Sequence, residues 1–108
     1  MPLDLSNIFK TLEGNIVNLA KQSMSDYLSQ GISDGTAIVN NMRDKIEQWT
    51  LDLSAGVIDA EDFKSLVLGE KDLLKMTALT QAGLALIRVD KFKNDVCNLI
   101  INTVTAVI

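Results

Sequence analysis

Apolar residues recur at steps of three and four along most of this chain, which is the spacing of one face of an α-helix. The first such stretch covers residues 5–30, with polar side chains between the apolar ones. Its apolar face consists of Leu5, Ile8, Phe9, Leu12, Ile16, Leu19, Ala20, Ser23 and Tyr27. Gly31 follows directly and can adopt the left-handed backbone that closes many helices. We therefore predict a first helix over residues 5–30 and a turn at Gly31.

A second helix is predicted to start at Ser33, Asp34 or Thr36, since each side chain can accept a backbone hydrogen bond as a capping residue. Its apolar face consists of Ile38, Val39, Met42, Ile46, Trp49 and Leu53. Gly56 ends this helix, with Leu51 placed as the apolar partner of the closing turn.

A third, short helix follows over residues 60–68. Asp59 can cap it, Glu61 and Asp62 place negative charge on its first turn, and Ile58 can pack onto Phe63. Gly56 and Asp59 are so close in sequence that the second and third helices should form a tight αα-hairpin. Gly69 is predicted to break the third helix before the next one begins.

Residues 70–108 keep a helical pattern to the end of the chain, as one long helix or as two. Between Leu73 and Val89 this pattern is apolar on nearly every side, and a helix that is apolar all round is surrounded by protein. Three short neighbouring helices can hardly enclose it, so we expect another molecule to cover it. The expected interface residues are Leu73, Met76, Ala78, Leu79, Ala82, Gly83, Leu84, Ile87, Val96, Ile100, Val104 and Val107. The many β-branched residues after Val96 leave a strand as the alternative for that stretch.

The predicted fold class is therefore all-α, as one domain over residues 1–108. We expect a small bundle of four or five helices with αα-hairpin turns at Gly31 and Gly56. The long C-terminal helical region would be completed by oligomerisation. A chain of 108 residues fits a single domain, and its 47% hydrophobic content is high for so small a core.

Net charge and cysteine content limit the classes of partner and the cellular compartment that we expect. The net charge of −4 lacks the positive surplus that attracts nucleic acid, so none is expected as a partner. The single cysteine, Cys97, cannot form a disulfide within the chain, and the residues before Lys10 do not resemble a secretory signal. We therefore expect a cytoplasmic protein. Charged residues interrupt every apolar stretch, so we expect no membrane-spanning helix.

The sequence contains few of the residues and motifs that catalytic sites use. Histidine, the commonest general base and zinc ligand, is absent, and no glycine-rich phosphate loop occurs. The acidic residues that crowd the first turn of the third helix are explained by the helix dipole. A buried, unreactive thiol is the expected state of Cys97. We expect no catalytic residues, no metal site and no cofactor.

The stretch from Gly56 to Phe63 resembles two known patterns. One is the second half of a calcium-binding EF-hand loop, but Leu51, Leu53 and Ala55 occupy the positions of the first ligands and offer no side-chain oxygen. The other is the bacterial short C-terminal oligomerisation hairpin, which joins two small helices by a Gly-x-Ile turn. The residues that resemble this hairpin begin further upstream and are Trp49, Leu53, Gly56, Ile58, Glu61 and Phe63. Any well-capped αα-hairpin shares these features, so no family is assigned.

The sequence thus favours a noncatalytic interaction or structural protein that self-associates as a helical bundle, with a homodimer as the simplest assembly. The other possible partner is a different helical protein. The alternative is a protein that binds an apolar small molecule or lies on a membrane surface. The acidic balance argues against anionic membranes.

Overall fold

The computed structural model describes residues 4–108, and most of these residues lie in helices. The α-helices are α1 (Leu5–Ser23), α2 (Leu28–Asn41), α3 (Arg43–Ser54), α4 (Ala60–Gly69), α5 (Thr77–Gln81) and α6 (Leu86–Val107). Two single-turn 3₁₀ helices, η1 (Ser25–Tyr27) and η2 (Lys71–Leu73), lie between them. The predicted all-α class is confirmed. The alternative of a strand after Val96 is wrong, because that stretch belongs to α6.

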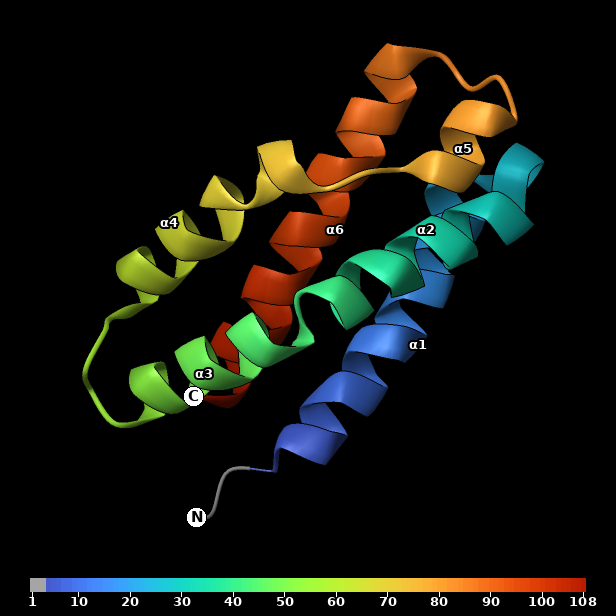
Figure 1. The fold of residues 1–108 in the computed structure, drawn as a ribbon. Coiled ribbons are helices and arrows are strands. Elements are labelled where there is room, and N and C mark those ends of the chain that lie inside the picture. The colour runs from blue at the N-terminus through green and yellow to red at the C-terminus, as the bar shows by residue number, and fades with distance from the viewer. Residues whose placement is uncertain (1–3) are drawn as a thin grey trace.

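The helices pack around α6 and α1, which run in opposite directions along the molecule (Figure 1). The Asn15 side-chain amide of α1 donates a hydrogen bond to the Thr103 hydroxyl of α6, at 3.2 Å. Helix α2 packs along α1, α4 packs along α6, and α5 lies against α2. Helices α2 and α3 form one bent rod, since the Met42 amide at the bend still donates to the carbonyl of Ile38 at 3.0 Å.

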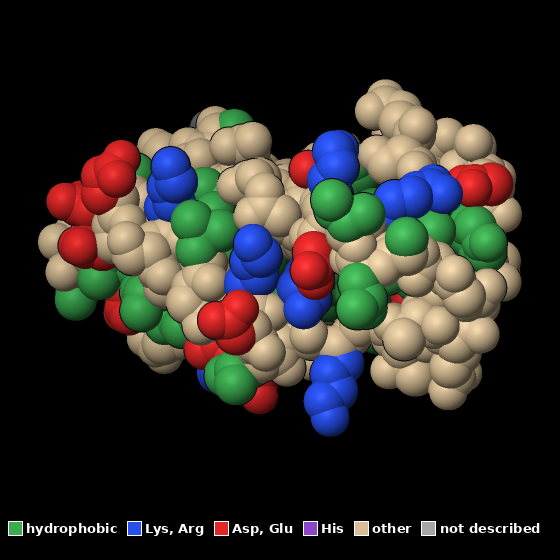
Figure 2. All heavy atoms as spheres, turned by 90° about the horizontal axis from the view of Figure 1, so that it is seen from above, with side chains coloured by type: hydrophobic (Ala, Val, Ile, Leu, Met, Phe, Trp, Pro, Cys, Tyr) green, Lys and Arg blue, Asp and Glu red, His purple; other side chains and the backbone are tan. Residues whose placement is uncertain are grey.

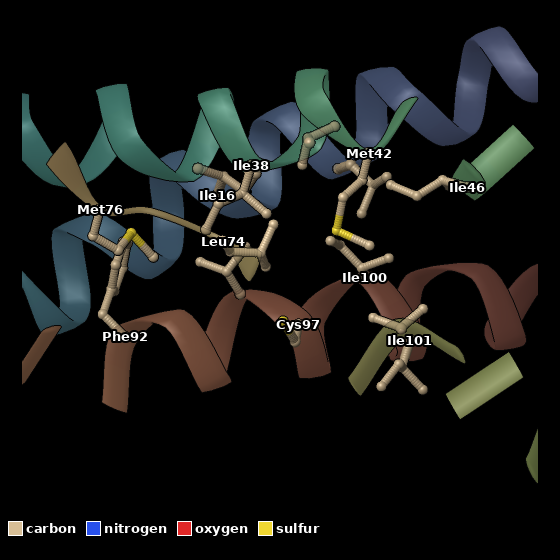
Figure 3. Packing of buried hydrophobic residues seen from close by; sticks show 14 of the residues in the cluster. Ile16, Ile38, Met42, Ile46, Leu74, Met76, Phe92, Cys97, Ile100 and Ile101 are labelled. Carbon is tan, nitrogen blue, oxygen red and sulfur yellow. The ribbon is translucent and has the colours of Figure 1, made fainter. Parts of the chain in front are cut away.

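The apolar faces expected from the sequence meet in one core (Figure 3). The buried side chains of the first two predicted faces are Ile8, Phe9, Leu12, Ile16, Ala20, Ile38, Val39, Met42 and Ile46. Helix α6 adds Val89, Phe92, Val96, Cys97, Ile100, Ile101 and Val104. Each large aliphatic side chain that is removed from water contributes about 1.5–3 kcal/mol, so this cluster is the main source of stability.

The predicted turn at Gly31 is wrong. The chain reverses direction earlier, at residues 24–27, and Gly31 lies inside α2. A Cβ atom on Gly31 would lie 3.1 Å from the Cβ of Met24, and one on Gly35 would lie 2.7 Å from Cγ2 of Ile16. Both glycines are therefore present because α1 and α2 approach closely. The expected caps at Ser33, Asp34 and Thr36 are also interior positions of α2.

The αα-hairpin at Gly56 is confirmed. Gly56 has a φ of 78°, its amide donates to Leu53, and the Val57 amide donates to Asp52 at 2.9 Å, which is the Schellman pattern of helix closure. Leu51, its expected apolar partner, stays 45% exposed. Asp59 caps α4, as predicted, and α4 ends at Gly69. The Asp62 carboxylate also accepts a hydrogen bond from the Asp59 amide, which completes a reciprocal cap that was not predicted.

The C-terminal region is not one long helix. Leu74 and Ala85 have extended backbones, with ψ of 139° and 138°, and Gly83 has a φ of 88°. These positions isolate the short helix α5 and turn the chain back on itself before α6 begins (Figure 1). The apolar stretch between Leu73 and Val89 is thus a folded segment with an inner and an outer side.

One buried polar group has no partner within residues 4–108. Thr50 of α3 is fully buried, and its hydroxyl makes no hydrogen bond. Leaving such a group unsatisfied costs about 1–3 kcal/mol, whereas the isosteric valine has no polar atom to bury.

We predict that Thr50→Val raises the free energy of unfolding by about 1 kcal/mol, because it removes an unsatisfied hydroxyl without changing the packed shape. Chemical denaturation measures the difference. The matched control is Thr105→Val, since the Thr105 hydroxyl donates to the carbonyl of Ile101 at 2.8 Å and its removal gives no gain. A Thr50→Val variant that is less stable than the parent would contradict this assignment.

Candidate functional site

A surface groove of about 440 Å³ lies between the segment 74–81 and the first turns of α6. Its floor is apolar and comes from the buried side chains of Leu74, Met76 and Val89. Its rim consists of Lys75, Thr77, Thr80, Gln81, Leu86, Asp90 and Lys93. The groove therefore offers an apolar surface bordered by hydroxyl, amide and charged groups.

Asp34 positions the wall that carries α5. This residue of α2 is only 4% exposed, and its carboxylate accepts hydrogen bonds from the backbone amides of Ala78 at 2.9 Å and Leu79 at 2.8 Å. These amides belong to the first turn of α5, whose own preceding residue, Met76, provides no side-chain cap. Asp34 thus caps a helix that lies more than forty residues further along the chain. The negative charge also matches the positive end of the helix dipole.

Gly83 closes the other end of α5. Its left-handed backbone allows the Gly83 amide to donate to Thr80 at 3.1 Å and the Leu84 amide to donate to Leu79 at 3.2 Å. This is the same Schellman pattern as at Gly56, and here Leu79 and Leu84 are both buried. In the sequence, Gly83 was predicted only as an interface residue. The missed signal was Leu84, which directly follows Gly83 and stands five positions after Leu79. This is the spacing of the apolar pair in a Schellman turn.

The wall formed by α6 is anchored by two polar contacts. The Arg88 guanidinium donates from both terminal nitrogens to the two carboxylate oxygens of Asp26, each at 3.0 Å. This hydrogen bonding lowers the pKa of the Asp26 carboxyl and raises the pKa of Arg88. Further along, the Lys71 ammonium of η2 donates to the Asn94 side chain of α6 at 3.3 Å. Both ends of the folded segment are therefore fastened to the bundle.

The structure divides the predicted interface residues into two groups. Six of them lie in the chain's own core and do not face outward, namely Met76, Leu79, Leu84, Val96, Ile100 and Val104. Ala78 and Ala82 are half-buried, whereas Leu73, Gly83, Ile87 and Val107 are exposed. The first group is unavailable to a partner of the folded chain, because these side chains pack in its own core. An interface on the exposed group stays a prediction.

Three large apolar side chains stand out on the exposed side of this segment. Leu73 and Leu86 are each 71% exposed, and Ile87 is 80% exposed. Leu86, which also lines the groove, was missing from the predicted interface. Its position at the first turn of α6 could not be recognised while residues 70–108 were read as one continuous helix. We call Leu73, Leu86 and Ile87 the exposed apolar trio.

The face of the molecule seen from above carries charges of both signs. Seen from above, green apolar side chains lie in small patches among blue lysines or arginines and red carboxylates (Figure 2). Among residues 4–108, the ion pairs are Arg43–Glu47, Lys45–Glu70, Arg88–Asp26 and Lys91–Asp95. The groove residues Lys75, Asp90 and Lys93 belong to none of them. The groove thus presents two cations and one anion that are available to a partner.

The reactive groups of the chain are in structural roles. Cys97 is fully buried, and burial raises the pKa of its thiol, which leaves it protonated. Asp59 and Asp62 accept each other's backbone amides at 2.8 and 3.1 Å, as the helix-cap interpretation expected. Across residues 4–108, no three potential metal ligands of the His, Cys, Asp or Glu type come together. Within the same residues, none of the helices has the length and apolar character needed to cross a bilayer.

Comparison of the chain with protein-family models, with curated proteins and with solved structures finds no match. The site must therefore be interpreted from its own geometry.

We predict that Arg88→Met raises the pKa of Asp26 towards its ordinary value, because the guanidinium that stabilises the carboxylate is gone. The folded-state pKa of Asp26 lies below its unfolded value, so this pair adds stability above the unfolded pKa and loses it as pH falls through the folded pKa. Carboxyl NMR titration measures the pKa directly. Lys91→Met, which removes only the pair with Asp95, is the control and should leave Asp26 unchanged. An Asp26 pKa that is the same in the parent chain and in Arg88→Met would refute the pairing.

Proposed function

We propose that this chain is a noncatalytic interaction protein that associates with a second copy of itself into a larger helical bundle, as a two-fold symmetric dimer. The observation that carries the proposal is the exposed apolar trio beside an apolar groove. Isolated exposed leucines are common on soluble proteins, but three such side chains on one folded segment that also lines an apolar groove favour an interaction site. Among residues 4–108, four large apolar side chains are more than two thirds exposed; three of them belong to the trio, and the fourth is Val57.

The distribution of apolar residues supports this proposal. The core accounts for most apolar side chains of α1, α2 and α6, yet residues 73–87 keep several outward although Gly83 folds this segment back. Burial of each exposed leucine or isoleucine against a partner would contribute about 1.5–3 kcal/mol. In a symmetric dimer each contribution occurs twice.

The chemistry of the chain agrees with a protein partner in the cytoplasm. The net charge of −4 disfavours nucleic acid, and a single buried thiol suits a reducing compartment. The buried state of Cys97 and the capping roles of Asp59 and Asp62 support a noncatalytic role.

An apolar small molecule is the second candidate, favoured by the size of the groove. Ligand sites commonly have volumes of about 300–1,000 Å³ and apolar linings, and this groove of about 440 Å³ has an apolar floor. Native mass spectrometry of the purified protein separates the two candidates, since a bound ligand adds mass to a single chain. A membrane-surface role has less support, because α6 directs Val96, Ile100 and Val104 into the core.

We predict that the parent chain sediments as a dimer at micromolar concentration and that Ile87→Asp sediments as a monomer with unchanged helicity. The reason is that a carboxylate on the trio would have to lose its water in the interface. Val57→Asp is the matched control, because Val57 is 72% exposed but lies on the turn between α3 and α4. A folded parent chain that sediments as a monomer would exclude the proposal.

A further inference from the structure

The groove residues of α6 form a single stripe along the helix. Leu86, Val89, Asp90 and Lys93 follow one another at steps of three, one and three, so they share one helix face, and all four line the groove. Along this stripe the character changes from apolar at the start of α6 to acidic and then to basic. Lys75 adds a second cation from the opposite wall.

The charges of this stripe favour a partner surface that carries both positive and negative groups. Asp90 and Lys93 make no ion pair among residues 4–108, whereas Lys91 of the same helix pairs with Asp95 at 3.3 Å. A uniformly acidic or basic partner would satisfy one sign and repel the other. A second copy of this chain matches the stripe, because a two-fold axis reverses its direction and sets acid against base.

The exposed apolar side chains are also placed so that a two-fold axis brings those of one copy towards those of the other. Leu86 and Ile87 precede the charged part of the stripe, at the start of α6. Leu73 ends η2, whose Lys71 side chain donates to Asn94, one position beyond Lys93, so η2 lies towards the other end of the stripe. A two-fold axis that crosses α6 between Asp90 and Lys93 therefore brings Leu86 and Ile87 of one copy towards Leu73 of the other.

We propose that the first three turns of α6 form an isologous, antiparallel dimer interface in which Asp90 of each copy pairs with Lys93 of the other and the exposed apolar trio packs on either side. This inference rests on the proposed self-association and adds the surface and the charge pairing that define it. Because the same pair occurs twice across the axis, the interface favours a second copy of this chain over partners whose surface carries a single charge.

Two charge reversals test this pairing. In Asp90→Lys both stripe charges are positive, and in Lys93→Glu both are negative, so each variant alone repels itself across the axis. We expect each to self-associate at least about tenfold more weakly than the parent chain. An equimolar mixture pairs unlike charges at both sites, and we expect sedimentation to show that it recovers the dimer. Lys10→Glu makes the same change of charge at an exposed position of α1, away from the start of α6, so it is the control and should leave the dimer intact.

The possible results separate the two levels of the proposal. A parent dimer that neither reversal weakens means that the chain self-associates through another surface, which overturns this inference alone. Weakened single variants whose mixture does not recover overturn the Asp90–Lys93 pairing. A monomeric parent chain overturns the proposed function as well. Should either variant lose helicity, the salt dependence of the parent dimer decides: added salt weakens paired charges, and a dissociation constant that ignores salt contradicts the pairing.

Discussion

The carboxylate of Asp34 is the interaction on which the arrangement of the C-terminal half depends. An almost fully buried carboxylate is costly unless hydrogen bonds replace its lost water. Here the amides of Ala78 and Leu79 supply them, and hydrogen bonds to charged groups contribute about 1.5–3 kcal/mol each. Helix α5 has only five residues, far too few to be stable by itself. Asp34, the Schellman turn at Gly83 and the buried Leu79 together make this short helix possible.

Fixing α5 on α2 decides which apolar side chains are hidden. Met76, Leu79 and Leu84 turn inward and complete the core, while Leu86 and Ile87 remain outside. The groove arises from the same geometry, because the extended backbone at Leu74 and Ala85 separates α5 from the start of α6. The chain thus shelters part of its apolar surplus without a partner, while Leu73, Leu86 and Ile87 stay exposed on this segment. Their exposure makes a self-associating protein the function that we propose.

Local signals in the sequence predicted the structure between Gly56 and Gly69 well. The closure at Gly56, the cap at Asp59 and the end of α4 at Gly69 depend on residues within a few positions of one another, and all three were predicted correctly. Gly31 was misinterpreted because a glycine that permits a left-handed turn and one that permits close packing look alike. Only the packing of Met24 against α2 distinguishes the two cases.

The long-range contacts were beyond reach of the sequence. Asp34 looked like the cap of its own helix, and nothing near it indicates that its acceptor oxygens serve α5 instead. The uniform apolar character between Leu73 and Val89 hid the breaks at Leu74 and Ala85, so buried residues such as Met76 and Leu84 were assigned to an interface. The alternative of two helices after Gly69 was closer to the structure than the single long helix.

Amide hydrogen exchange at Ala78 and Leu79 tests most directly whether Asp34 holds the folded segment. In the parent chain both amides should exchange slowly, as core amides of α6 do. In Asp34→Ala they should exchange at least about tenfold faster, while the amides of α1 and α6 keep their protection. Fast exchange at both positions in the parent chain, or equal rates in the variant, would contradict the account.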